Sequence, residues 1–251
     1  MRVTGAALVT GASYGVGAAT ALALTRAGYD VAVTATKIEN LASTVQALQA
    51  SGRRVLPLVL DLRDEANIAR MTKEVYGALG GIDVLVNNAG ANLRKRATDV
   101  TAAEWDALMA VNIRGTFFLT QQVGRGMIAS GRGGAIVNIA STHALAGAPE
   151  RSTYGISKAA LLDMTRMLAV EWAEHGIRVN AVAPGRLATA SPSRAEKGAD
   201  RDYMDAMLER IPLRRLATAE EVAAAVVYLA SPAAASITGQ VLVLDGGLTA
   251  A

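Results

Sequence analysis

Cysteine is absent from the 251-residue sequence, and histidine occurs only twice, as His143 and His175. The lack of cysteine excludes disulfides and thiolate metal ligands. Two histidines are too few for a histidine-rich metal site, so no bound metal is expected. Aromatic residues make up 4% of the chain and do not alternate with basic ones, which argues against a stacking platform for nucleic acid. The net charge of +3 comes from scattered side chains, so no nucleic-acid partner is expected.

Long apolar runs are also missing. No uninterrupted run approaches the roughly 20 residues that cross a bilayer, and the short apolar run near the first residue breaks at a glycine loop before it could form a signal-peptide core. We therefore expect a soluble, cytoplasmic protein without a membrane partner. Its length and its apolar content of 51% are sufficient for one large α/β domain with a sizeable core.

Short β-branched runs alternate with longer segments of helical spacing. Because the short runs are apolar at nearly every position, they predict a parallel sheet covered by helices on both faces. The alternation shows no break in composition, which predicts a single Rossmann-like, doubly wound domain over residues 1–251 with a seven-stranded parallel sheet. Residues 186–210, rich in small and charged side chains, are expected to form a mobile lid over the substrate. The seven expected strands are residues 7–10, 30–35, 55–60, 82–87, 134–140, 177–183 and 240–245.

The segment TGASYGVG, Thr10 to Gly17, follows the first expected strand and opens directly into a helix. Its three glycines allow a tight turn and a close approach of backbone to phosphate, and the N-terminus of the helix offers N–H groups to a pyrophosphate. This position predicts a dinucleotide site. The loop residues expected to contact the cofactor are Gly11, Ser13, Tyr14, Gly15, Val16 and Gly17.

The residues after the second strand bear on the choice of cofactor. A domain selective for NAD places a carboxylate there to bind the ribose 2′-hydroxyl, whereas this chain has Ala35, Thr36 and Lys37. The absence of a carboxylate and the presence of a lysine favour NADP(H), with NAD(H) as the alternative. Further cofactor contacts are expected from residues at other strand ends and on the helix after the fifth strand: Asp61, Leu62, Asn88, Ala89, Gly90, Tyr154, Lys158, Pro184, Gly185, Leu187 and Thr189.

Ser141 ends the fifth expected strand, and Tyr154 and Lys158 lie on the helix that follows it. Positions i and i+4 share one helix face, so Tyr154 and Lys158 are expected to point toward the same object. Each residue also has an ordinary interpretation, Ser141 as a cap, Tyr154 as an exposed ring, and Asn112, in the segment VNIRG, as a helix cap. Those interpretations do not explain why all of them stand in register with the glycine loop.

Taken in order, the glycine loop, the NNAG turn of residues 87–90, Ser141, the Tyr154–Lys158 pair and the terminal ITGQVLVLDGG resemble the short-chain dehydrogenase/reductase family over nearly the whole chain. The resemblance implies hydride transfer between nicotinamide and a carbinol carbon, with Tyr154 as general acid or base. It implies that Lys158 lowers the pKa of the phenol and binds the nicotinamide ribose, and that Ser141 holds the substrate oxygen. Asn112 would lie in a kinked helix and hold a water that relays protons. Family members usually form tetramers, so a homotetramer is expected.

Substrate contacts are harder to assign. The candidates are Asn92, Arg94, Ser141, His143, Arg151, Tyr154 and Arg186, with Glu150 nearby. Their arginines favour a polar or anionic substrate, because a guanidinium binds carboxylates well. Two kinds of enzyme fit. One is a dehydrogenase of sugars, polyols or sugar acids, since this chain resembles the gluconate-type members of the family in NNAGANLRKR. The other is a 3-oxoacyl thioester reductase, which it resembles in VTAT and ITGQVLVLDGG. A rival of another class is a cofactor-sensing or scaffold protein without turnover, although this chain keeps the serine, tyrosine and lysine.

Overall fold

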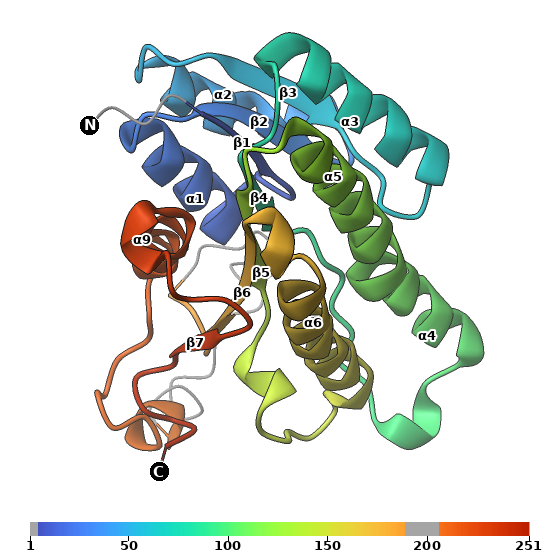
Figure 1. Cartoon of the computed structure of the whole chain (residues 1–251). Helices are drawn as coiled ribbons and strands as arrows, with labels where there is room; N and C mark the ends of the chain where they lie inside the picture. The colour runs from blue at the N-terminus through green and yellow to red at the C-terminus, as the bar shows by residue number, and fades with distance from the viewer. Residues whose placement is uncertain (1–4, 189–205, 251) are drawn as a thin grey trace.

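The computed structural model describes residues 5–188 and 206–250. Its centre is a seven-stranded sheet, parallel throughout, in the order β3-β2-β1-β4-β5-β6-β7 (Figure 1). Each expected strand is present with bounds that differ by at most two residues, so the doubly wound parallel sheet is confirmed. The strands are β1 Ala6–Val9, β2 Asp30–Ala35, β3 Val55–Val59, β4 Val84–Asn87, β5 Gly134–Ile139, β6 Ile177–Pro184 and β7 Val241–Leu244.

Helices connect the strands, and several begin at side-chain caps. Asp64 accepts hydrogen bonds from the backbone N–H groups of residues 66 and 67, and Thr101 and Thr218 each form a capping box with the glutamate three residues later. These caps fix where a helix starts. The helices are α1 Gly15–Arg26, α2 Ala42–Gln49, α3 Glu65–Leu79, α4 Ala102–Met109, α5 Thr116–Ser130, α6 Ser152–Glu171 and α9 Ala219–Ala230.

The two faces of the sheet bury different helices. Val9 and its neighbours on one face pack with α1, α2 and α9, whereas Leu8 and its neighbours on the other face pack with α3, α5 and α6. Figure 1 shows these two layers on opposite sides of the strands. Successive strand residues point to opposite faces, so a strand covered on both sides must be apolar throughout, which explains the pattern in the sequence.

The strand order reverses between β1 and β4. β1 pairs with β2 on one side and with β4 on the other, so the turns after β1 and β4 lie next to each other. In open sheets of this kind, ligands bind outside the carboxyl ends of the strands at such a switch point. The glycine loop follows β1, and the turn that begins at Asn87 follows β4, on this edge.

A network of hydrogen-bonded, buried amide and hydroxyl groups lies below that edge. The Asn87 Nδ2 donates to the Thr120 hydroxyl and to the Asn138 Oδ1, at 2.8 Å each. The Asn138 Nδ2 donates in turn to the Thr165 hydroxyl at 2.8 Å. This hydrogen-bond network links β4 and β5 to α5 and α6. Buried polar groups of this kind are costly to leave unpaired.

Part of the expected lid lies outside the described residues, and so does Thr189. On the described side, Leu187 pairs with Ala217 in an isolated parallel bridge, and the Ala188 N–H donates to the Ala217 oxygen at 3.0 Å. Among the described residues, no helix has both the length and the apolar character needed to cross a membrane.

Candidate active site

The glycine loop turns sharply from β1 into α1. Gly11 and Gly15 have φ angles of 65° and 58°, in the left-handed region where a side chain would be strained. A β-carbon at Gly11 would lie 2.8 Å from the Ala89 backbone, and one at Gly17 would overlap the Gly11 oxygen and the Asn88 amide. Only glycine fits at these two positions. The resulting turn lets the first turn of α1 present its N–H groups to a phosphate, as a dinucleotide site requires.

Side chains from β1 and from the turn after β4 brace this loop. The Asn88 Nδ2 donates to the oxygens of Thr10 and Gly11, at 2.9 and 2.8 Å. The Thr10 hydroxyl accepts the backbone N–H groups of Asn88 and Ala89, at 3.0 Å each. The Thr44 hydroxyl of α2 donates to the Ala12 oxygen at 2.8 Å. The turns after β1 and β4 are therefore held as one rigid surface.

The residues expected to choose between cofactors lie at the end of β2. Ala35 is buried, whereas Thr36 and Lys37 are exposed, and no carboxylate stands at these three positions. Asp61, after β3, forms an ion pair with Arg63 at 2.6 Å, and this hydrogen-bonded pair holds the pKa of Asp61 below its ordinary value. Its expected contact with the cofactor stays a prediction.

Lys158 lies on α6 with its ammonium buried. Its Nζ donates to the Ile139 oxygen, at the end of β5, at 2.7 Å, and lies 5.9 Å from the centroid of the Tyr154 ring. The side chain is only 5% exposed, and burial lowers its pKa from 10.5 to about 8. Lys158 therefore still carries its proton at neutral pH, beside the phenol.

Asn112 lies in a π-helical turn, Ala110–Gly115, between α4 and α5. Its Oδ1 accepts the Ala91 N–H at 2.7 Å, and its Nδ2 donates to the Ala91 oxygen at 3.0 Å and to the Ser157 hydroxyl at 2.9 Å. A β-carbon at Gly90 would lie 3.3 Å from the Asn112 Oδ1 and 3.5 Å from the Lys158 Nζ, so these groups meet at one point. Single π turns inside helices often occur at functional sites.

Ser141, His143 and Tyr154 border the same edge. The Ser141 hydroxyl accepts the His143 N–H at 3.2 Å, so the serine does act as a cap, of the short helix Thr142–Ala144. The rings of His143 and Tyr154 meet edge to face, with centroids 6.1 Å apart. Burial, and secondarily the charge of Arg151, lower the pKa of His143.

The remaining substrate candidates come from two loops and one strand end. Arg94 pairs with Glu150, and Arg151 donates to Asn92. These residues lie together, between β4 and α4 and between β5 and α6. Arg186, after β6, contacts the Met207 sulfur at 3.7 Å.

A family model described as enoyl-(acyl carrier protein) reductase matches residues 11–249 of the chain. The 2-dehydro-3-deoxy-D-gluconate 5-dehydrogenase of Dickeya dadantii (strain 3937) is 37% identical over 241 residues, which cover 96% of this chain and 94% of that protein. The chain belongs to the short-chain dehydrogenase/reductase family. As a member, it is an NAD(P)-dependent oxidoreductase that acts on CH–OH groups.

Two further relatives of this short-chain dehydrogenase are named for different substrates. The 3-oxoacyl-(acyl-carrier-protein) reductase of Thermotoga maritima is 39% identical over 249 residues, covering 99% of each chain. A solved structure assigned as a 2-deoxy-D-gluconate 3-dehydrogenase of Agrobacterium tumefaciens, with bound NADP, superposes with a TM-score of 0.88 at 36% identity, covering 98% of this chain and 96% of that chain.

Three contributors to the site of this dehydrogenase were not singled out from the sequence. Ser157 links Asn112 to the backbone of Tyr154, because its hydroxyl donates to the Tyr154 oxygen at 2.7 Å. Its spacing, three residues after Tyr154 on one helix, is the signal that could have identified it. The side chains of Thr10 and Asn138 support the turns from below, and their polarity within apolar strands could have marked them.

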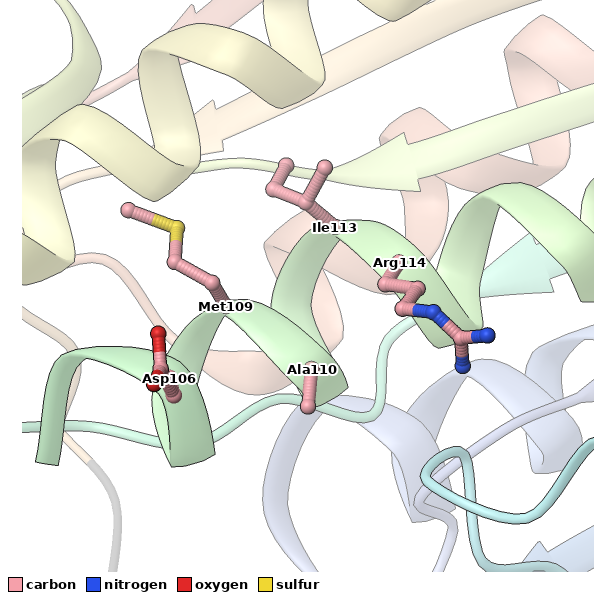
Figure 2. A pocket seen from close by; sticks show the side chains of 5 residues that line it. All are labelled: Asp106, Met109, Ala110, Ile113 and Arg114. Atoms are coloured by element: carbon pink, nitrogen blue, oxygen red, sulfur yellow. The ribbon is translucent and has the colours of Figure 1, made fainter. Parts of the chain in front are cut away.

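A surface hollow of about 370 Å³ lies along α4 and the π-helical turn of the dehydrogenase (Figure 2). Met109, Ala110 and Ile113 give it an apolar lining between the charges of Asp106 and Arg114. None of the residues expected to be catalytic lines it.

Proposed function

We propose that this enzyme interconverts a secondary alcohol and a ketone on a polar or anionic substrate, such as a sugar, a polyol or a sugar acid, with Tyr154 as general acid or base. The observation that carries the proposal is the placement of the Lys158 ammonium 5.9 Å from the Tyr154 ring, at the edge where the glycine loop lies. When bound, the nicotinamide accepts or supplies the hydride. The protein's own side chains handle the proton and the orientation.

Tyr154 would take the proton of the substrate hydroxyl in oxidation and return it to the carbonyl oxygen in reduction. A phenol ordinarily titrates near pH 10, so it needs a neighbour that favours its anion. The buried Lys158 ammonium supplies that charge in a poorly solvated setting, where a charge acts strongly on its surroundings. Ser141 would hold the substrate oxygen against the phenol by a hydrogen bond.

Asn112 and Ser157 act through backbone rather than on substrate, and are positioning residues. Asn112 ties the turn after β4 to Ser157, and Ser157 ties that turn to the Tyr154 backbone. Both hydrogens of the Asn112 Nδ2 are used in these bonds, so the relay water that the family resemblance implies would donate to an oxygen of Asn112.

A sugar acid is the substrate we favour, supported by the similarity to 2-dehydro-3-deoxy-D-gluconate 5-dehydrogenase and by Arg151, which directly precedes α6 three residues before Tyr154. The test is nicotinamide turnover on a mixed panel: D-gluconate and D-glucitol in oxidation, and an acetoacetyl thioester in reduction, each with both cofactors. We expect the highest kcat/KM with the sugar acid. A preference for the thioester by tenfold or more would contradict this assignment.

A 3-oxoacyl thioester reductase is the second candidate, because the chain is 39% identical to such a reductase along its whole length. An acyl-carrier protein is acidic and would need a basic surface beside the site. The loop Asn92–Arg96 carries three basic residues, but two of them are paired with glutamates, Arg94 with Glu150 and Lys95 with Glu104. This pairing lowers the positive charge left for a carrier and favours the sugar acid.

For the cofactor we propose NADP(H), because Lys37 is exposed after β2 where a carboxylate would repel a 2′-phosphate. The bound NADP in the similar Agrobacterium structure supports the same choice. Lys37→Glu should raise the KM for NADP about tenfold and change the KM for NAD less than twofold. A tenfold change corresponds to the lower end of the free energy that a charge-assisted hydrogen bond contributes, as expected at an exposed site. Lys73→Glu, an exposed lysine of α3, is the matched control. Equal changes for both cofactors would rule out a contact with the 2′-phosphate.

We propose a homotetramer as the working assembly. Exposed apolar side chains, Trp105 of α4, Phe117 of α5 and Val170 of α6, lie on helices next to the hollow of Figure 2. A second surface lies at β7, an edge strand whose Leu242 is 40% exposed. Exposed apolar surface and open sheet edges are both commonly covered by partners, and two such surfaces are what a tetramer of two-fold pairs uses.

A further inference from the structure

The carbonyl oxygens of the glycine loop are held by two side chains from different elements. A phosphate is attracted by backbone N–H groups and repelled by carbonyl oxygens, so a loop that binds one must turn its carbonyls elsewhere. In residues 10–13, the first two oxygens accept hydrogen bonds from Asn88, after β4. The next two accept from the Thr44 hydroxyl of α2, Ala12 at 2.8 Å and Ser13 at 3.3 Å. All four oxygens are therefore engaged by the protein.

The two bonds to Thr44 also fix where the following N–H groups point. In a trans peptide the C=O and the next N–H lie on opposite sides of the chain. Because the Ala12 oxygen is held toward α2, the Ser13 N–H points away from α2. The bond to the Ser13 oxygen places the Tyr14 N–H in the same way. Successive N–H groups on one side of a loop form a concavity that binds anions.

The start of α1 is arranged for an anion as well, and the structure describes all of this helix. Tyr14, at the N-cap position, makes no capping hydrogen bond through its side chain, and the first turn holds no acidic residue. By contrast, α3, α4 and α9 begin at the capping side chains Asp64, Thr101 and Thr218. A side-chain cap takes up N–H groups of the first turn. The positive end of α1 is thus left for a ligand.

Thr44 uses its hydroxyl in a different way from an ordinary helix threonine. Threonines within helices commonly donate to a carbonyl three or four residues earlier. Thr25 of α1 does so, to the Leu22 oxygen at 2.8 Å. Thr44 is 5% exposed, and its hydroxyl donates instead to a loop 31 and 32 residues earlier in the chain. The contact therefore serves the loop rather than α2.

We propose that Thr44 is a positioning residue of the dinucleotide site: its hydroxyl turns two carbonyls of the glycine loop toward α2, so that the N–H groups of Ser13 and Tyr14 face the pyrophosphate. The inference rests on the proposed cofactor site and makes it more specific. Without the hydroxyl, the buried Ala12 oxygen loses its partner, and rotation of the peptide brings a carbonyl toward the phosphate. NAD and NADP share the pyrophosphate, so Thr44 acts equally on both, whereas Lys37 acts on NADP alone.

The test measures the Kd of NADPH and of NADH by titrating the fluorescence of the bound cofactor, and the Tm of the cofactor-free protein. Thr44→Val keeps the volume and removes the hydroxyl. It should raise both Kd values by the same factor, about fivefold, as expected for one neutral hydrogen bond. Thr44→Ser keeps the hydroxyl and should leave both Kd values within twofold. Thr25→Val, a buried threonine whose hydroxyl bonds within its own helix, is the matched control and should also stay within twofold.

The serine variant separates the orientation of the loop from general packing. It removes a buried methyl group and should lower Tm, yet keep the affinity. If Thr44 only supported packing, the loss of affinity would follow the loss of Tm in all three variants, and that result overturns the proposal. Unchanged affinity in Thr44→Val, or a loss confined to NADPH, overturns it too. Failure of the unaltered enzyme to bind either dinucleotide overturns the proposed cofactor site, and the inference with it.

Discussion

Replacing Tyr154 with phenylalanine should lower kcat by about 10³-fold, within the range that positioned acid–base groups contribute. The change removes one oxygen and keeps the ring that packs against His143. Cofactor affinity, measured by quenching of protein fluorescence, should change less than twofold, because the glycine loop and its braces do not involve the phenol. The loss should therefore appear in turnover alone.

Tyr228→Phe on α9 is the matched control, since Tyr228 is an exposed tyrosine away from the strand ends that carry the site. It should keep the activity of the unaltered enzyme. A Tyr154→Phe variant that retained more than a tenth of the original kcat, with cofactor bound normally, would remove Tyr154 from the proton-transfer step.

Lys158→Met should have two opposite effects. Turnover should fall at least a hundredfold, because the phenolate loses its neighbouring ammonium. Stability at pH 7 should nevertheless rise. Methionine fills a similar volume without a charge, and removing a buried charge of this kind is often stabilising.

The pH dependence of that gain follows from the burial of Lys158. Its pKa is about 8 in the folded protein and 10.5 as a model value, so between these pH values the unfolded chain binds more protons and the free energy of unfolding rises with pH. At pH 7 the buried charge costs about 3 kcal/mol, against about 2 kcal/mol for the hydrogen bond from the charged ammonium to Ile139 that methionine loses. Lys158→Met should thus gain about 1 kcal/mol, or about 3 °C in Tm.

Calorimetry at equal protein concentration, at pH 7 and at pH 10.5, measures this difference. Most of the gain should disappear at the higher pH, where the lysine of the unaltered enzyme is neutral in the folded protein and half deprotonated in the unfolded chain. Lys73→Met, the exposed control, should show no gain at either pH. A Lys158→Met variant that is less stable at pH 7 would mean that its ammonium is better solvated than its burial indicates.

The strands and the shared helix face of Tyr154 and Lys158 could be predicted from sequence because their signals are local. β2, expected at 30–35, has those bounds in the structure, since an apolar run that follows a glycine turn has few alternatives in a sheet covered on both faces. The position of Tyr154 and Lys158 on one face of a helix likewise follows from a spacing of four. The glycine loop combines a motif with a neighbouring strand, and both are visible in the sequence.

The pairing of side chains between loops could not be predicted in this way. Arg94 and Glu150 are 56 residues apart, and their contact depends on the left-handed turn at Glu150. The π-helical turn at Asn112 depends in turn on hydrogen bonds to Ala91 and Ser157, which come from two other elements. Sequence spacing shows which residues share an element, whereas these features depend on how separate elements meet.

The strand order also determines the order in which the sheet can be completed during synthesis. β1, β2 and β3 are neighbours in the chain and can pair early, but β4 must return to the far side of β1 before β5 and β6 can be added. Pairing between distant segments is slow, because loop closure must come first. A nascent chain that has made only the first three strands carries a complete glycine loop and an open edge on β1, where β4 belongs. Such an edge can pair with another chain, so this enzyme is most exposed to aggregation before residue 84 has left the ribosome.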